Sequence, residues 1–293
     1  MRLSLIGTGL MGRPMAERLL ERGHMVTVFN RTRSKAEPLR AMGASIAETP
    51  EEAIAASSST ILMLADYSAI EAVLFSRGAV PPLRDKTIVQ MGTIKPIESQ
   101  TLCRRVEEAK GRYLEAPVLG SKTEARAGTL IVMVGGTDED FVCGRSWLMD
   151  VGSEIVHVGP VGKAAVLKLA LNQLIASHIA AFSLSLGLIQ RSEIDIDLLM
   201  QVVRKSALFA PMFEKKLPRL LARDYTNPNF PTKYLLKDVH LCREEAQAAQ
   251  LNSTVLVAIE NVVEQAIAKG LANDDYSALY EVIAPNPMPD RSF

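Results

Sequence analysis

This chain of 293 residues has few cysteines and no net charge, and each of these absences excludes a class of protein. The chain contains only three cysteines, Cys103, Cys143 and Cys242, which lie far apart and form no C-x-x-C pair. This odd, scattered set predicts free thiols in a reducing compartment, without a disulfide framework and without a zinc or other metal site. Net charge is also lacking, because 33 basic residues balance 33 acidic ones. With no basic block either, binding to nucleic acid is not indicated.

Targeting and membrane-spanning signals are the next features to consider. No signal or transit segment precedes the first strand-like run, so we expect a cytoplasmic protein. One long apolar run from Ala164 to about Gln190 would span roughly 40 Å as a helix. Such a helix either crosses a membrane or forms the centre of a folded core. Polar groups are costly in a bilayer, so the core helix is favoured by the polar residues inside the run, which are Lys168, Asn172, Gln173 and His178.

The most specific motif that is present is Gly7-Thr8-Gly9-Leu10-Met11-Gly12, close to the N-terminus. The apolar run Leu3–Ile6 enters it as a strand, and an amphipathic helical pattern follows it. In this context the glycines allow a tight turn, a close approach to a pyrophosphate, and close packing of helix on strand. The free N–H groups at the start of the helix suit the phosphates. The motif predicts a dinucleotide-binding turn, with a purely structural glycine turn as the alternative.

The end of the next expected strand, Met25–Phe29, carries information on the type of cofactor. An NAD-specific protein places an aspartate or glutamate there, whereas this chain has Asn30, Arg31 and Thr32. A guanidinium and a hydroxyl can hold a 2′-phosphate that a carboxylate would repel, and Lys35 adds positive charge. We therefore expect NADPH or NADP⁺, with an ordinary solvated arginine as the alternative for Arg31.

The order of the expected elements predicts the fold class. Strand-like runs alternate with helical ones as far as residue 163, which predicts an α/β Rossmann-type domain with a doubly wound, mostly parallel sheet over residues 1–163. Residues 164–293 show only helical patterns, so we expect a second, all-α domain whose long first helix packs against another copy of the chain. The expected strands after the first are Met25–Phe29, Thr60–Ala65, Thr87–Met91, Leu130–Val134 and Ile155–Val158, and the later helices are Ile196–Ser206, Met212–Arg223, Leu235–Ala249 and Ser253–Lys269.

Lys168 and Asn172 are the best candidates for chemistry. They lie four residues apart, so a helix places them on one face, one turn from each other. A lysine on an apolar helix is costly without a partner, and carbonyl reduction needs one proton besides the hydride. We expect Lys168 to donate that proton and Asn172 to fix a substrate hydroxyl or carboxylate. The alternative is a lysine that extends to solvent and an asparagine that caps a loop.

Two further stretches carry weaker signals. Glu115–Ser121 is rich in turn residues that could present backbone N–H groups and the Ser121 hydroxyl to an anion, although most such clusters are ordinary turns. Lys237-Asp238 lies in a helical pattern, where an exposed charge pair is the default. The four histidines show no ligand spacing, and we treat them as structural.

Taken together, these motifs resemble those of the β-hydroxyacid dehydrogenases, and among them most of all the glyoxylate and succinic semialdehyde reductases. The resemblance covers nearly the full length of the chain. It implies an N-terminal Rossmann domain, a C-terminal helical domain, and an active site in the cleft between them. The blocks that carry it are Gly7–Ala16, Glu115–Ser121, Gly159–Asn172 and Lys237–Val239.

The resemblance also implies roles for individual residues. Lys168 matches the family's proton donor and Asn172 its substrate-orienting asparagine. The segment Asn229–Pro231 resembles the semialdehyde reductase branch. The other implied contacts are Leu119, Gly120, Ser121, Phe230 and Asp238 for substrate, and Gly7, Gly9, Leu10, Met11, Gly12, Asn30, Arg31, Thr32, Lys35, Leu64, Ala65, Asp66, Thr93 and Lys237 for the cofactor.

Three positions depart from the family pattern. Leu119 and Gly92 stand where the family usually has serine, and Leu184 stands where it usually has glutamate. Leu119 removes a hydroxyl that would contact a substrate carboxylate and adds bulk nearby. Short acids such as glyoxylate are therefore expected to bind less well than the resemblance suggests.

The sequence thus predicts an NADPH-dependent oxidoreductase that reduces small aldehyde acids to hydroxy acids, as a homodimer or homotetramer. The expected substrate is a small molecule, and neither nucleic acid nor a membrane is an expected partner. The alternatives are an imine reductase or a 3-hydroxyacid dehydrogenase on the same fold, or a non-catalytic NADP-binding protein. Lys168 argues against the imine reductase, whose relatives generally lack this lysine.

Overall fold

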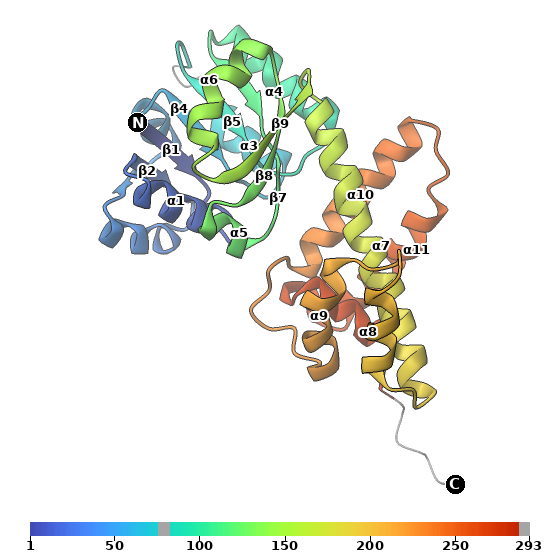
Figure 1. The fold of residues 1–293 in the computed structure, drawn as a ribbon. Helices are drawn as coiled ribbons and strands as arrows, with labels where there is room; N and C mark the ends of the chain where they lie inside the picture. Colours follow the sequence, from blue (N-terminus) through green and yellow to red (C-terminus); the bar gives the residue numbers. More distant parts are fainter. Residues whose placement is uncertain (76–82, 287–293) are drawn as a thin grey trace. The chain divides into compact units, whose positions relative to one another are not determined.

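The computed structural model describes residues 1–75 and 83–286. The chain divides into two compact units, Met1–Lys168 and Leu169–Phe293. The division falls inside one long helix, close to the boundary at residue 164 that the sequence predicts. Figure 1 shows the sheet that forms the first unit and the helices that form the second.

Strands of the first unit form one sheet with a Rossmann-type order. From edge to edge the order is β3-β2-β1-β4-β5-β6-β8-β7, and β9 pairs with β8. Strand β1 pairs in parallel with both β2 and β4, so the strand order reverses around it. Strand β8 runs antiparallel to β6 and β7, and the predicted mostly parallel sheet is confirmed. The strands are β1 Arg2–Ile6, β2 Met25–Phe29, β3 Ser45–Ile46, β4 Ser59–Leu62, β5 Thr87–Gln90, β6 Arg112–Glu115, β7 Val118–Leu119, β8 Leu130–Gly135 and β9 Gly152–Gly159.

Helices cover both faces of this sheet because neighbouring strand residues point to opposite sides. Leu5 of β1 packs into a core with Met15 of α1, whereas the next residue, Ile6, packs into a second core with Ile54 of α2 and Leu102 of α4. Apolar residues on both faces make the sheet the buried layer of the unit. The helices are α1 Gly12–Glu21, α2 Pro50–Ala55, α3 Tyr67–Phe75, α4 Pro96–Glu108, α5 Lys122–Ala127 and α6 Asp138–Leu148, with 3₁₀ turns at Arg33–Lys35 and Glu37–Met42.

The long apolar run folds as a single helix, α7, over Lys163–Arg191. Ala176, Ile179, Phe182 and Leu186 on one face of it are buried in the core of the second unit. Their spacing of three or four residues is that of one face of a helix. Among the described residues, α7 is the one helix that is long and apolar enough to cross a membrane. The core helix of a soluble protein can have the same length and composition.

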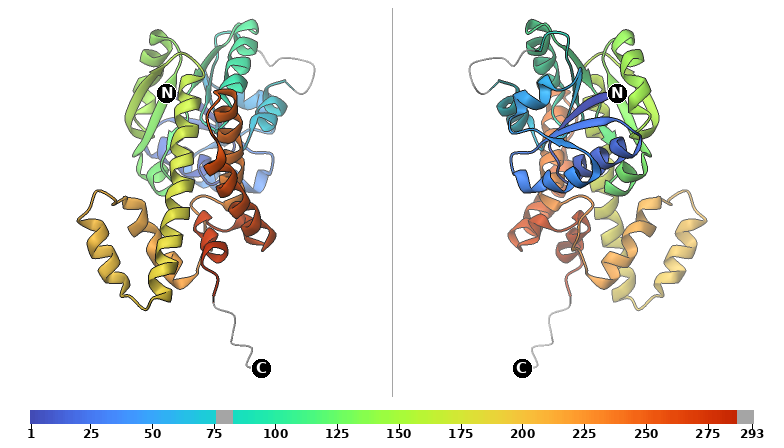
Figure 2. Two further views of the ribbon diagram at one scale, coloured as in Figure 1. Left: turned by 90° about the vertical axis from the view of Figure 1, so that its right-hand side faces the viewer. Right: turned by 90° about the vertical axis from the view of Figure 1, so that its left-hand side faces the viewer.

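The second unit is helical, as the sequence predicts. Phe213 of α9 stacks on Phe182 of α7, with ring centroids 4.5 Å apart, which places α9 against the long helix. Figure 2 shows α7 with the later helices of the unit from two further sides. Within residues 169–286 the only strand-like pairing is an isolated bridge between Pro231 and Asp275. The helices are α8 Ile196–Arg204, α9 Pro211–Ala222, α10 Thr232–Ala248, α11 Thr254–Ala268 and α12 Tyr280–Ile283, with 3₁₀ turns at Leu271–Asn273 and Tyr276–Leu279.

The second unit contains a buried ion pair that no sequence motif predicts. Lys216 Nζ of α9 lies 2.6 Å from Asp275 Oδ1, and both side chains are buried. The backbone N–H and hydroxyl of Ser277 also donate to Oδ1, and the N–H of Asn229 donates to Oδ2 at 3.0 Å. Burial alone would raise the pKa of Asp275, but Lys216 and Ser277 outweigh it and keep this pKa below its usual value.

This pair gives a prediction for stability. Replacement Asp275→Asn leaves the Lys216 ammonium buried without a counter-charge and is expected to destabilise the protein by roughly 3–5 kcal/mol. Because the folded-state pKa of Asp275 is lowered, its stabilisation is present above the unfolded-state pKa of about 4 and is lost as the pH falls through the folded-state pKa. Urea unfolding from pH 7 to pH 3 measures both effects, and the variant should lose less stability than wild type over that range.

The matched control is Glu214→Gln on α9, the helix that also carries Lys216, and it removes an exposed ion pair with Arg204 of α8. That change should alter the unfolding free energy by less than about 1 kcal/mol. If Asp275→Asn behaved like Glu214→Gln, the ion pair would not stabilise the unit as described.

Candidate active site

Four loops with sequence-predicted cofactor residues leave the same edge of the sheet. They follow β1, β2, β4 and β5, all of which run parallel to their neighbours. The carboxyl ends of parallel strands lie at one edge, and Figure 1 shows this part of the sheet. The structure therefore brings together the segments Gly7–Gly12, Asn30–Thr32, Leu64–Asp66 and Gly92–Thr93.

Main chains pack closely where these loops meet. Gly7 has φ +100°, and a Cβ there would overlap the carbonyl oxygen of Met63 after β4. A Cβ at Gly92 after β5 would lie 2.6 Å from the carbonyl oxygen of Leu64. The serine that the family usually has at position 92 would therefore require the loop after β4 to move.

The two remaining glycines of the motif have different surroundings. A Cβ at Gly12 would overlap the carbonyl oxygen of Gly7, so this glycine is needed for the first turn of α1 to lie against the strand. A Cβ at Gly9 would meet nothing within 4 Å, so the backbone there faces open space. Helix α1 has no acidic residue in its first turn and no side chain that caps it. These surroundings fit a phosphate group at the start of α1.

In the loop after β2, Asn30 bonds to the neighbouring loop, whereas Arg31 is available to a ligand. The backbone N–H of Thr8 donates to Asn30 Oδ1 at 3.0 Å, and Asn30 Nδ2 donates to the carbonyl of Thr32 at 2.9 Å. The exposed Arg31 has no hydrogen bond or ion pair with any residue that the structure describes. Arg33, by contrast, pairs with Glu37 and Glu48.

Helix α7 begins at a buried carboxylate. Glu115, the last residue of β6, is 2% exposed, and its Oε2 accepts from the N–H of Gly162 at 2.9 Å and of Ala164 at 3.1 Å. Burial raises the pKa of Glu115 above its usual value, and hydrogen bonds from the Ser99 side chain and from these amides act in the opposite direction. Lys168 lies on α7 after this first turn and is buried. The helix with the predicted proton donor thus starts at the carboxyl edge that carries the cofactor loops.

Asn172 follows one turn after Lys168 and contacts Asp238 of α10. Asn172 Nδ2 donates to Asp238 Oδ2 at 2.6 Å, and Lys237 Nζ lies 2.8 Å from Asp238 Oδ1. A carboxylate only accepts, so the amide nitrogen of Asn172 has to face it. Asn172 Oδ1 is buried and has no hydrogen-bond partner among the described residues. The group that Asn172 offers is therefore an acceptor, which suits a hydroxyl or an ammonium and not a carboxylate.

This cluster differs from the exposed charge pair that is the default for Lys237-Asp238, because Asp238 is buried. Phe230, just before α10, lies edge-on to the ring of Tyr276 at 5.8 Å. The Asp275 contact to Asn229 holds this segment in place. Asn172, Lys237 and Asp238 come together in the second unit, and Phe230 is fixed on the adjoining loop.

In the predicted anion-binding turn, the hydrogen-bond donors of Ser121 are already bonded to a residue of the chain. Ser121 is the N-cap of α5 and accepts from the N–H of Thr123, while its own N–H and hydroxyl donate to Glu124. The S-x-x-E spacing of Ser121 and Glu124 is the signature of a capping box, and this signal was present in the sequence. Leu119 pairs with Ile131 in the sheet, and Gly120 has φ +136°.

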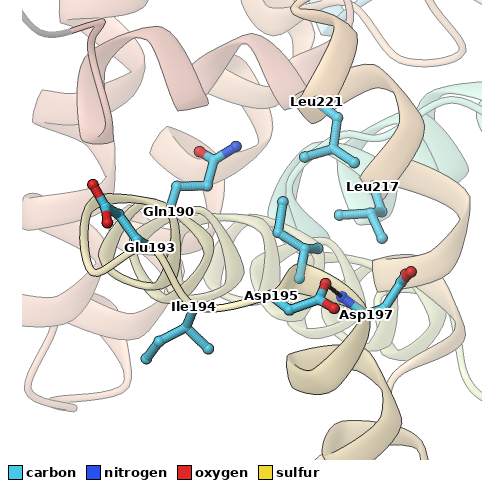
Figure 3. Close-up of a pocket in the computed structure, with 8 residues that line it drawn as sticks. Gln190, Glu193, Ile194, Asp195, Asp197, Leu217 and Leu221 are labelled. Atoms are coloured by element: carbon cyan, nitrogen blue, oxygen red, sulfur yellow. Dashed lines mark hydrogen bonds between the residues drawn. The ribbon is translucent and has the colours of Figure 1, made fainter.

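A surface hollow of about 690 Å³ lies elsewhere, where α7 turns into α8 beside α9. Figure 3 shows Asp195 accepting from the N–H of Asp197 there, at 2.9 Å. None of the sequence-predicted site residues is among its lining residues, which are Gln190, Glu193, Ile194, Asp195, Ile196, Asp197, Leu217 and Leu221.

Comparison with known proteins agrees with these observations. Residues 2–159 match the model for the NAD-binding domain of 6-phosphogluconate dehydrogenase. Residues 162–283 match the model for the NAD-binding region of NADP-dependent 3-hydroxyisobutyrate dehydrogenase. Together the two matches cover both units of the chain.

Individual relatives extend over almost the whole chain. Glyoxylate/succinic semialdehyde reductase 1 of Arabidopsis thaliana is 33% identical, over 97% of this chain and 98% of that protein. The 2-hydroxy-3-oxopropionate reductase of Escherichia coli is 32% identical, over 97% of each chain. In fold, the chain is similar to the 3-hydroxyisobutyrate dehydrogenase of Mycobacterium tuberculosis, with a TM-score of 0.86, 22% identity, and coverage of 96% of this chain and 98% of that one. The chain belongs to the β-hydroxyacid dehydrogenases, a family of NAD(P)-dependent oxidoreductases.

Proposed function

We propose that this protein is an NADPH-dependent reductase of small aldehyde acids such as succinic semialdehyde and glyoxylate. The observation that carries the proposal is the pair Lys168 and Asn172, one turn apart on a helix that starts at the cofactor edge of the sheet. The activities for which the relatives are named support this substrate class. Leu119, with no hydroxyl, favours succinic semialdehyde over the shorter glyoxylate.

Lys168 and Asn172 have different roles in the proposed reduction. A bound NADPH supplies the hydride for the carbonyl carbon. The Lys168 ammonium donates a proton to the carbonyl oxygen as negative charge develops there, and solvent later reprotonates the amine. Asn172 Oδ1 accepts from the lysine ammonium or from the product hydroxyl, because its amide nitrogen is held by Asp238. The burial of Lys168 and Asn172 keeps water away from the proton that moves.

The proton-donor role gives the first functional prediction. Lys168→Met should lower kcat about 10²–10⁴-fold, because a positioned general acid is lost, while NADPH still binds. The measurement follows NADPH absorbance with succinic semialdehyde, glyoxylate and neutral aldehydes of similar length. The matched control is Lys163→Met, which removes an exposed lysine from the first turn of the same helix.

Wild type should turn over an aldehyde acid, with a lower KM for succinic semialdehyde than for glyoxylate, and Lys163→Met should match it. Full activity of Lys168→Met would refute the proton-donor role. Absence of turnover by wild type across the whole panel would refute the reductase itself.

Preference for NADPH over NADH is a second part of the proposal. Its support is Arg31, which is exposed and unpaired among the described residues, and the absence of an acidic residue from Asn30–Thr32. Replacement Arg31→Ala should weaken NADPH binding about 10- to 100-fold by removing a charge-assisted hydrogen bond to the 2′-phosphate. NADH binding should not change. Titration of nicotinamide fluorescence gives both dissociation constants.

The matched control for this test is Arg33→Ala, since Glu37 and Glu48 already engage the Arg33 guanidinium. It should leave the preference for NADPH nearly intact. An equal loss of NADPH and NADH affinity in Arg31→Ala would show that this residue does not bind the 2′-phosphate.

Self-association into a dimer or tetramer is a third part. Leu184 and Leu188 of α7 are 64% and 66% exposed, and Leu198 and Val202 of α8 are also exposed. Because an apolar helix face of this kind is costly in water, we assign it to a second copy of the chain. Light scattering after size exclusion should give at least twice the monomer mass, and Leu188→Lys should lower it. A monomeric wild type would contradict this assignment.

A further inference from the structure

The first turn of α7 is held by a side chain that is distant in the sequence. Glu115 Oε2 accepts from the N–H of Gly162 and of Ala164, 47 and 49 residues further along the chain. The first N–H groups of a helix have no partner inside the helix, and buried ones have to be satisfied by other groups. Here the carboxylate at the end of β6 is the group that satisfies them.

Three other helices of the same unit are capped by the residue that immediately precedes them. Thr49, Ser121 and Thr137 immediately precede α2, α5 and α6, and each accepts from an N–H of the helix that it caps. Helix α7 is preceded by Gly162, which has φ +101° and no side chain that could cap it. The start of α7 is therefore set by the sheet and not by its own flanking residue.

The space around this contact is closely filled. A Cβ at Gly135 of β8 would overlap Glu115 Oε2, and a Cβ at Gly162 would lie 2.7 Å from Gln100 Nε2 of α4. The Glu115 carboxylate thus lies in a confined position between β8 and the start of α7. A shift of the helix relative to β6 would break both hydrogen bonds at once.

We propose that Glu115 is a positioning residue for the reaction, which acts by fixing the start of α7 and, through it, Lys168. The inference rests on the proposed function, because it concerns the lysine that is the proton donor there. Lys168 follows Ala164 by four residues, so a displacement of the first turn is passed directly to the turn that carries the lysine. Proton transfer depends steeply on distance, and a misplacement of about 1 Å costs on the order of 100-fold in rate.

Two variants weaken the contact between Glu115 and the start of α7 to different extents. Glu115→Gln keeps the size of the side chain and one oxygen that can accept, whereas Glu115→Leu removes the acceptor. The matched control is Thr137→Ala, which removes the cap of α6, a helix of the same unit without any predicted site residue. Loss of such a cap costs about 1 kcal/mol, so this control reports stability loss alone.

The first measurement is amide hydrogen exchange of the peptide that spans the start of α7, and it needs no substrate. Exchange there should accelerate in Glu115→Gln and more in Glu115→Leu, and not in Thr137→Ala. If Glu115→Leu fails to fold, Glu115→Gln alone decides. Unchanged exchange in Glu115→Gln would overturn the positioning role, whether or not the enzyme turns over.

The second measurement is kcat with a solvent deuterium isotope effect. In Glu115→Leu, kcat should fall about 100-fold. The KM for NADPH should stay the same, and the isotope effect should rise because proton transfer has become slower. A merely smaller folded fraction would lower the rate and leave the isotope effect unchanged, and that result would overturn the inference. Inactivity of wild type with every aldehyde would instead overturn the proposed function.

Discussion

The close approach of main chains at the carboxyl edge of the parallel strands is the constraint from which the site follows. Gly7, Gly12 and Gly92 have no room for a Cβ because each lies against a backbone carbonyl group of a neighbouring turn or loop. This packing places the loops after β1, β4 and β5 side by side, and of these glycines and Gly9 only Gly9 faces open space where a Cβ would stand. A ligand that binds there meets backbone N–H groups and the start of a helix, so its phosphates are recognised mainly by the main chain.

Buried carboxylates position the other candidate residues within each of the two units. Glu115 holds the start of α7, Asp238 orients the amide of Asn172, and Asp275 binds Lys216 and the segment before α10. A buried charge is costly unless it is paired or hydrogen-bonded, so each of these groups fixes the position of its partners. The candidate reactive groups therefore depend on contacts between residues that are far apart in the chain.

The parts of the structure that the sequence predicted are those determined by local patterns. The glycine motif, the alternation of strands and helices and the extent of α7 depend on residues within about one turn or one strand of each other. Boundaries differ by a few residues, as for α10, which begins at Thr232 after Pro231 and not at Leu235. The substrate contacts that the resemblance implies remain predictions.

The parts that sequence analysis missed depend on long-range contacts or on a signal that was overlooked. Glu115 stands next to turn residues in the sequence, and nothing nearby indicates that it meets a helix 47 residues later. The pair of Lys216 and Asp275 spans 59 residues and lies within no motif. Ser121 is different, because the glutamate three residues later already marked it as a helix cap.

The main functional consequence of this packing is a dinucleotide site at the carboxyl edge of β1, β2, β4 and β5. The most direct test is amide hydrogen exchange of the wild-type protein with and without saturating NADPH. We expect slower exchange in the peptides that contain Gly7–Gly12, Asn30–Lys35 and Leu64–Asp66, with no change around the hollow beside α8 and α9. Binding of NADPH without slower exchange in these three segments would show that the cofactor does not bind at this edge.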